Sequence, residues 1–318
     1  PQIQLHATNH GQPELAISLD ANFEQRNRFN SRWQLTDWQR PEQMHIQGEL
    51  HLDWPELSQF QALVPQAGPF NGQLKADWQI QGSLQQPEFT GHMDLTQLTW
   101  IEPSSGLQLS NGEVQIASAD QQEFQIQSSA QLGTGIAHLQ GTIAPLAKRW
   151  RFNLTGNELE LMNGPQGQLF ASPALTLSGQ GNELHIDGTV TIPSAKLRPT
   201  AADNPVQESA DIVIAGQVEE PAKAPLDLHG QLELKLGEDV KVRAGNARTH
   251  LAGGLQLVWN DQLIPIANGE IRLQDGSIRA YGQNLEIDQG QILFEQGPAD
   301  DPRLNIKAAR RIFGDPIV

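Results

Sequence analysis

Residues 225–236 read PLDLHGQLELKL, and leucine or glycine stands at every second position from Leu226 to Leu236. The positions between them are polar or charged. A period of two sends successive side chains to opposite faces of an extended strand. One apolar and one polar face are typical of a half-buried antiparallel strand. The alternation resumes from Leu251 to Trp259.

The same alternation recurs throughout the chain, for example over Leu15–Phe23, Phe70–Ile80 and Phe124–Leu132. Tight-turn dipeptides separate such runs, because Asn, Asp and Gly tolerate the positive φ of hairpin turns. The spacing predicts roughly 20 strands. No strand–helix–strand rhythm is present, so we expect an all-β protein. The dipeptides are Asn71–Gly72, Asn111–Gly112, Asn163–Gly164, Asp187–Gly188, Asn268–Gly269 and Asp275–Gly276.

Glycine recurs on the apolar face of these runs, where a missing side chain permits a strand to bend. We therefore predict one long antiparallel meander that curls into an elongated hydrophobic groove. Very little helix is expected. The best candidate is a short helix near residues 54–64, within DWPELSQFQALVP (53–65), where Asp53 or Trp54 is a possible cap and Pro55 suits the first turn. A second apolar turn is expected near Pro145–Arg149.

Two stretches lack the alternation, PTAADNPVQESA (199–210) and EEPAKAP (219–225). Their Pro, Ala and acidic content is typical of loops or disorder. We expect three parts: groove repeats over 1–198, a loop-rich and possibly disordered segment over 199–225, and a C-terminal groove domain over 226–318, truncated at its end.

Composition excludes several classes of function. The 318 residues include 21 Lys and Arg against 37 Asp and Glu, a net charge of −16. This balance disfavours nucleic acid and electrostatic docking on anionic membranes. There is no cysteine, so thiolate catalysis, disulfides and Cys-ligated metal sites are excluded. No apolar run approaches the ~20 residues of a transmembrane helix. The chain begins at Pro1 without Met and ends in an apparent strand at Ile317–Val318, so we expect a fragment, with any membrane anchor outside it.

No catalytic or metal-binding residues are predicted, and no cofactor is implied. The nine histidines are scattered, and His6 and His10 would lie roughly 13 Å apart on a strand. No HExxH, EF-hand, Rossmann or GxSxG pattern is present. Adjacent acids such as Asp300 and Asp301 would face opposite sides of a strand, which makes an acid–base pair improbable.

The predicted groove is aliphatic and suits acyl chains, whose burial is worth about 0.8 kcal/mol per CH₂. The competing interpretation is a dry, self-packed solenoid or sandwich that binds nothing. The predicted lining residues of the groove are Leu232, Leu234, Leu236, Leu255, Leu257, Ile271, Leu273, Leu285, Ile287, Ile292, Phe294, Leu304 and Ile306.

Residues 269–310 resemble the C-terminal domain of the TamB family, subunits of the translocation and assembly module. A looser likeness to the family's internal repeat covers residues 70–116. The family pattern is a strand, a Gly turn, apolar-x-apolar-Tyr-Gly-Gln-x-Leu, Gly-x-apolar-x-Phe, Asn/Asp-Pro-x-Leu and Ala-x-Arg. Its elements match Gly276, Tyr281–Gly282–Gln283–Leu285, Gly290–Ile292–Phe294, Asp301–Pro302–Leu304 and Ala309–Arg310.

The resemblance implies a non-enzymatic rod of the AsmA-like, bridge-like lipid-transfer class, anchored in the inner membrane and crossing the periplasm to the outer membrane. Such proteins are expected to conduct phospholipids and to pair with TamA, an outer-membrane barrel protein of the Omp85 family. The alternative it implies is a scaffold for assembly and secretion of outer-membrane β-barrel proteins and autotransporters. The residues expected to contact the barrel are Ile278, Tyr281, Gly282, Phe294, Leu304 and Ile306.

Overall fold

The structure, a computed structural model, describes residues 2–9, 14–23, 27–120, 122–199, 227–280, 282–312 and 315–317. The chain divides into two units. Unit 1 comprises Pro1–Leu161 with Thr176–Gln180, and unit 2 comprises Met162–Leu175 with Gly181–Val318. Strands β11 (Leu159–Gly164) and β12 (Gly167–Gln180) contribute residues to both units.

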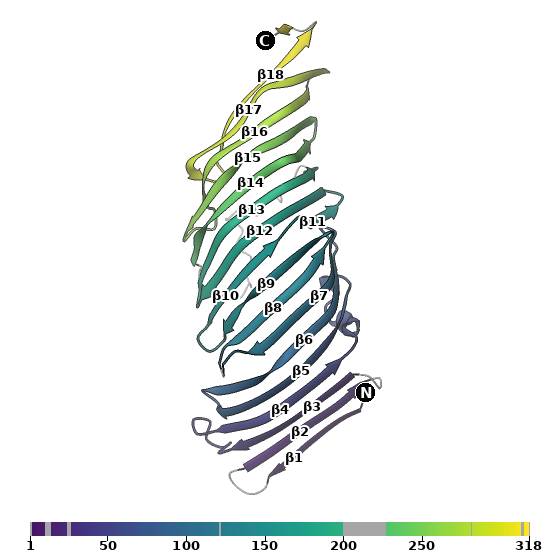
Figure 1. The fold of residues 1–318 in the computed structure, drawn as a ribbon, viewed down its shortest axis with the longest axis vertical. Helices are drawn as coiled ribbons and strands as arrows, with labels where there is room; N and C mark the ends of the chain where they lie inside the picture. The colour runs from purple at the N-terminus through teal and green to yellow at the C-terminus, as the bar shows by residue number, and fades with distance from the viewer. Residues whose placement is uncertain are drawn as a thin grey trace, which may run out of the picture. The chain divides into compact units, whose positions relative to one another are not determined.

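Unit 1 is an antiparallel meander in which each strand from β1 to β10 pairs with the next (Figure 1). This arrangement confirms the predicted all-β, mostly antiparallel fold. Its strands are β1 (Gln2–Asn9), β2 (Glu14–Phe23), β3 (Asn27–Thr36), β4 (His45–Trp54), β5 (Phe70–Ser83), β6 (Pro87–Glu102), β7 (Leu107–Ser118), β8 (Phe124–Leu132), β9 (Gly135–Ala144) and β10 (Arg149–Gly156).

Unit 2 continues in the same style from β14 to β19, where every pairing is antiparallel. One pair departs from the predicted meander, because β13 and β14 run parallel. Residues 200–226, which connect them, lie outside the described residues, and so does most of the predicted loop-rich segment over 199–225. The strands are β13 (Glu183–Leu197), β14 (Asp227–Ala244), β15 (Ala247–Asn260), β16 (Ile266–Ala280), β17 (Gln283–Pro298), β18 (Arg303–Ile312) and β19 (Asp315–Ile317).

The short helix is present where it was predicted, but it is a 3₁₀-helix. Helices η1 (Leu57–Leu63) and η2 (Pro65–Ala67) follow one another between β4 and β5. The first helical turn starts after Glu56, and no side chain caps it, so the predicted caps Asp53 and Trp54 belong to β4 instead. Short segments without caps favour the tighter 3₁₀ geometry. Residues 145–148, where a second apolar turn was expected, form a turn between β9 and β10.

The register gives each unit one apolar and one polar face, because directly opposite residues in a ladder project to the same side. In unit 1, Ile17, Trp33, Gly48 and Ile80 form a row across four strands. The neighbouring row, displaced by one residue, is polar: Ser18, Arg32, Glu49 and Gln79. The period-two alternation of the sequence is thus preserved across the sheet.

The core is thin. Seven of the thirteen buried apolar residues among those described are alanines, such as Ala76 and Ala267, while larger residues such as Leu234 and Leu257 stay half-buried. Two packed sheets would bury large aliphatic side chains between them.

Aromatic rings contact one another on the apolar face of unit 1. The ring centroids of Trp78 on β5 and Phe124 on β8 lie 5.4 Å apart, and those of Phe89 and Phe124 lie 5.5 Å apart. Gly91, opposite Trp78, has a φ of +150°, and a Cβ there would lie 2.1 Å from the backbone oxygen of Asp77. Only glycine permits this close approach of two strands beneath the rings.

Candidate functional site

The predicted groove residues of β14 and β15 lie directly opposite one another. Leu232 pairs with Leu257, and Leu234 pairs with Leu255. Leu236 pairs with Gly253, which in turn pairs with Ile271 on β16. Leucines at paired positions therefore form rows that cross the strands on a single face.

The rows continue across the next three strands. Ile271 pairs with Ile292, which pairs with Leu304 on β18. Phe294 lies opposite Gly269, and Gly290 lies opposite Ile306. Gly269, with a φ of +137°, would bring any Cβ to 2.4 Å from the backbone oxygen of Gly254. Glycine is therefore required there.

Two β-bulges keep the apolar residues on the same face where their numbering changes parity. On β16, the pairing steps from His250–Gln274 to Arg248–Ser277, so β16 contains one extra residue. On β17, it steps from Ile287–Ala308 to Gln289–Lys307. An extra residue reverses the alternation, so Ile278 and Ile292 face the same side as Leu273.

All thirteen residues predicted to line the groove share this face of unit 2. Their cross-strand partners are uncharged; they include Gly188, Val190, Ile192, Gly253, Ala267, Gly269, Ile278, Gly290 and Ala308. Leu255 is buried, whereas Leu304 and Ile306 on β18 are 65% and 44% exposed. We call this surface, from β14 to β18, the apolar face.

The residues predicted to contact a barrel partner do not form one cluster. Ile278 lies opposite Leu285 beside the β16–β17 hairpin, and Gly282 lies in that hairpin with a φ of +74°. Phe294 and Leu304 lie at the other end of the same strands, about 30 Å away at the usual rise per residue. Tyr281 lies outside the described residues.

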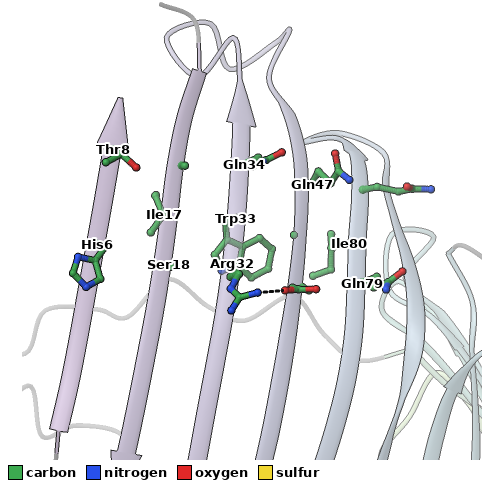
Figure 2. Close-up of a pocket in the computed structure, with 14 residues that line it drawn as sticks. His6, Thr8, Ile17, Ser18, Arg32, Trp33, Gln34, Gln47, Gln79 and Ile80 are labelled. Carbon is green, nitrogen blue, oxygen red and sulfur yellow. Dashed lines mark hydrogen bonds and ion pairs between the residues drawn. The ribbon is translucent and has the colours of Figure 1, made fainter. Parts of the chain in front are cut away.

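Hollows occur on the opposite, polar face, which the sequence analysis did not anticipate. In unit 1 a hollow of about 520 Å³ spans β1 to β5 (Figure 2). Ten of its fourteen lining residues occupy polar rows of the register, among them His6, Gln34 and Gln79. The ion pair between Arg32 Nη1 and Glu49 Oε1, at 3.3 Å, crosses it. Such a hollow depends on the lengths of neighbouring side chains and not on a sequence motif. The sequence therefore contained no pattern that could predict it.

Histidines and carboxylates alternate across the polar face of unit 1. His51 Nδ1 lies 2.5 Å from Asp77 Oδ1, and His92 Nε2 lies 3.7 Å from Asp94 Oδ2. Yet in the part of the chain that the structure describes, no three His, Asp or Glu side chains are arranged to hold a metal ion. These groups are exposed: His51 and Asp77 face each other across β4 and β5, whereas His92 and Asp94 are neighbours on one face of β6. His10 lies outside the described residues.

Comparison with known proteins matches both halves of the chain to the same protein family. The model of the TamB C-terminal domain matches residues 125–317, and that of the TamB N-terminal domain matches residues 1–95. The translocation and assembly module subunit TamB of Haemophilus influenzae is 24% identical over 314 residues. That alignment covers 93% of this chain and 24% of the relative, so the chain spans about a quarter of the length of the relative. Among the described residues, no helix has the length and apolar character needed to cross a bilayer.

Proposed function

This chain belongs to the TamB family of the translocation and assembly module, and from that premise we propose that its apolar face conducts phospholipid acyl chains between the inner and outer membranes. The family is non-catalytic and belongs to the cell envelope. The proposed location is the periplasm, with the full-length protein anchored in the inner membrane and reaching the outer one. No cofactor or metal is required.

One observation carries the proposal: thirteen aliphatic and aromatic side chains, all but Leu255 half-buried or exposed, form uncharged rows across five consecutive strands. Acyl chains bind such a surface by burial alone, at about 0.8 kcal/mol per CH₂. Contacts of this kind are non-directional, so a chain can move from row to row without breaking hydrogen bonds. The dry, self-packed alternative would need these side chains to be covered by protein.

The test places a charge on each face of one strand. Leu257→Glu puts a carboxylate on the apolar face, whereas Gln256→Glu, the adjacent residue on β15, puts the same charge on the polar face. Phospholipid that co-purifies with the chain is measured by native mass spectrometry and lipid extraction. We expect Leu257→Glu to lose bound lipid and Gln256→Glu to retain it. Equal lipid content in the two variants rejects the conduit.

The proposed partner is TamA, an Omp85-family barrel, and the proposed contact lies in β16–β18. Leu304 and Ile306 support it, because exposed apolar residues near a sheet edge favour association with another sheet. Photo-crosslinkers at Leu304 and at Asn305, its polar-face neighbour, test the contact. Crosslinking to the barrel from Leu304 and not from Asn305 is the expected result, and the reverse pattern excludes this face.

A second candidate function is assembly of outer-membrane β-barrel proteins, in which a terminal strand adds to a client sheet. Strands β17 and β18 support this candidate because they lie near the C-terminal end of the chain and form a regular ladder, in which Gly290 is opposite Ile306. Ile306→Pro removes a backbone donor and disrupts β18. If client assembly fails while lipid transfer persists, the scaffold function is favoured over the conduit.

A further inference from the structure

A hollow of about 380 Å³ lies on the polar face of unit 2, over the ends of β13 to β16. Five of its eleven lining residues are cations and one, Asp275, is acidic. The cations are Lys196, Arg198, Lys241, Arg243 and Arg248. A chain with 37 acidic and 21 basic residues thus concentrates positive charge at one place.

The register brings like charges directly together. Lys196 on β13 is paired with Lys241 on β14. Arg243 is paired with Arg248. Like charges at directly opposite positions destabilise a sheet. Two such pairs side by side are therefore a local cost that a bound anion would offset.

Most of these cations have no carboxylate partner in the described residues. Lys241 forms an ion pair with Asp239, and Lys196, Arg198, Arg243 and Arg248 form none. The hydrogen bond that Lys241 donates to Asp239 lowers the pKa of this carboxyl group. The positive charges of Lys241 and Lys196 lower the same pKa further. The Nδ1 atom of His250 is buried and has no hydrogen-bond partner among the residues that the structure describes. The hollow thus presents unused positive charge and unused hydrogen-bonding capacity.

The apolar face begins on the other side of the same strand ends. Leu197 is paired with Val242, and Ile278 with Leu285, within a single layer of sheet. Around the strand ends, a short path therefore leads from aliphatic side chains to the cationic hollow. An amphipathic molecule fits both surfaces, with its chains on one face and its anionic group on the other.

We propose that this hollow binds the phosphate of a phospholipid headgroup while the acyl chains lie on the apolar face. The proposal rests on the conduit function above and assigns its headgroup contact. Arg243 and Arg248 would donate paired hydrogen bonds to phosphate oxygens, as guanidinium groups do in other phosphate sites. The net charge of −16 does not prevent this, because salt screens exposed charges beyond about 8–10 Å.

The test uses dihexanoyl phosphatidylglycerol below its micelle concentration, inorganic phosphate, and dihexanoyl glycerol, which lacks the phosphate. The variant Arg243→Gln/Arg248→Gln removes two charges from the hollow. The control Lys235→Gln/Arg272→Gln removes two charges from the polar face of β14 and β16 outside it. Circular dichroism verifies that each variant is folded, and calorimetry measures binding.

We expect the hollow variant to bind the phospholipid at least tenfold more weakly than the wild type, and the control to bind it within twofold. Equal loss in both variants, or no loss in the hollow variant, overturns the proposal. Inorganic phosphate binding as tightly as the phospholipid would make the hollow a site for free phosphate and overturn the headgroup assignment. Binding of a polyglutamate peptide in preference to both phosphates would assign it to acidic protein segments.

Ile278→Glu separates failure of this proposal from failure of the conduit, because Ile278 lies on the apolar face beside the strand ends that carry the hollow. If the conduit is correct, this variant weakens the binding of the phospholipid and of dihexanoyl glycerol alike, whatever the hollow does. If the hollow binds phosphate without a conduit, Ile278→Glu leaves the phospholipid affinity unchanged and only the arginine variant lowers it.

Discussion

Ile287 and Ile292 lie on the same face of β17, although five positions separate them. Their partners on β18, Ala308 and Leu304, are four positions apart, so β17 contains one residue more than its neighbour over this interval. Asp288 is that residue, since Ile287 and Gln289 are paired with consecutive residues of β18. The bulge reverses the alternation once.

Deleting Asp288 should remove this reversal. A one-residue change in register sends every following side chain to the other face, so Ile292 and Phe294 would move to the polar face. We expect less bound lipid, more binding of a hydrophobic dye and lower solubility. Gln289→Ala keeps the length of the strand and should change none of these properties. A deletion variant that keeps its lipid would show that the bulge is dispensable.

The contact between Gly48 and Trp33 should set the stability of unit 1. A Cβ on Gly48 would lie 2.3 Å from Cε3 of the Trp33 ring, its cross-strand partner. Gly48→Ala should therefore lower the free energy of unfolding by about 1–3 kcal/mol, the usual cost of overpacking. Urea denaturation measures this change.

The Gly48→Ala loss should shrink in a Trp33→Leu background, because the smaller side chain makes room for the new methyl group. Additive effects of the two substitutions in a double-mutant cycle would place the cost elsewhere, in the 2.8 Å approach to the backbone oxygen of Arg32.

Helix η1 should be held to unit 1 by Phe60. Its ring centroid lies 4.8 Å from that of Trp54, which is 9% exposed at the end of β4. An aromatic pair contributes about 0.5–1.5 kcal/mol beyond the area it buries. Phe60→Ala should speed hydrogen exchange over residues 57–63 and shift the indole N–H resonance of Trp54.

Leu63→Ala is the matched control for Phe60→Ala, because Leu63 belongs to the same helix and is 76% exposed. Exchange that accelerates equally in both variants would mean that ring packing does not hold the helix.

The turn after β6 should weaken only in strong acid. The Ser105 hydroxyl and the backbone N–H groups of Ser104 and Ser105 donate hydrogen bonds to the Glu102 carboxylate and lower its pKa from 4.5 to about 2. A lowered folded-state pKa means that the stabilisation is fully present above pH 4.5 and is lost as the pH falls toward 2.

Carboxyl NMR should give a titration midpoint for Glu102 near pH 2, and Glu102→Gln should remove the pH dependence of the Ser104 and Ser105 amide signals. A midpoint near 4.5 would mean that the three hydrogen bonds do not persist in solution.

The sequence predicted the alternating strands because alternation is local, but it misplaced turns: Asn71–Gly72, Asp187–Gly188 and Asn268–Gly269 lie within β5, β13 and β16 rather than between strands. Leu232, Leu234, Leu255 and Leu257 could be assigned to one face without knowing their partners. The register could not be predicted, since it depends on bulges whose extra residues, such as Asp288, resemble any exposed polar residue.

The parallel pairing of β13 and β14 and the cationic hollow could not be predicted for a related reason. Lys196, Lys241 and Arg248 are far apart along the chain, and only the strand order brings them together. Net charge describes a whole chain, so it hid a local surplus of the opposite sign.

The parallel pair β13–β14 also has a kinetic consequence. Elsewhere in the described meander, each strand can pair with its predecessor through a hairpin, so the sheet can form strand by strand in sequence order. This sequential growth is interrupted at β14. Its first residue, Asp227, pairs with Glu183 at the start of β13, and 43 residues lie between the two in the sequence. Closing a loop costs entropy that grows with its length. Growth of the sheet would therefore pause there, and the strands beyond would nucleate as a second folding event.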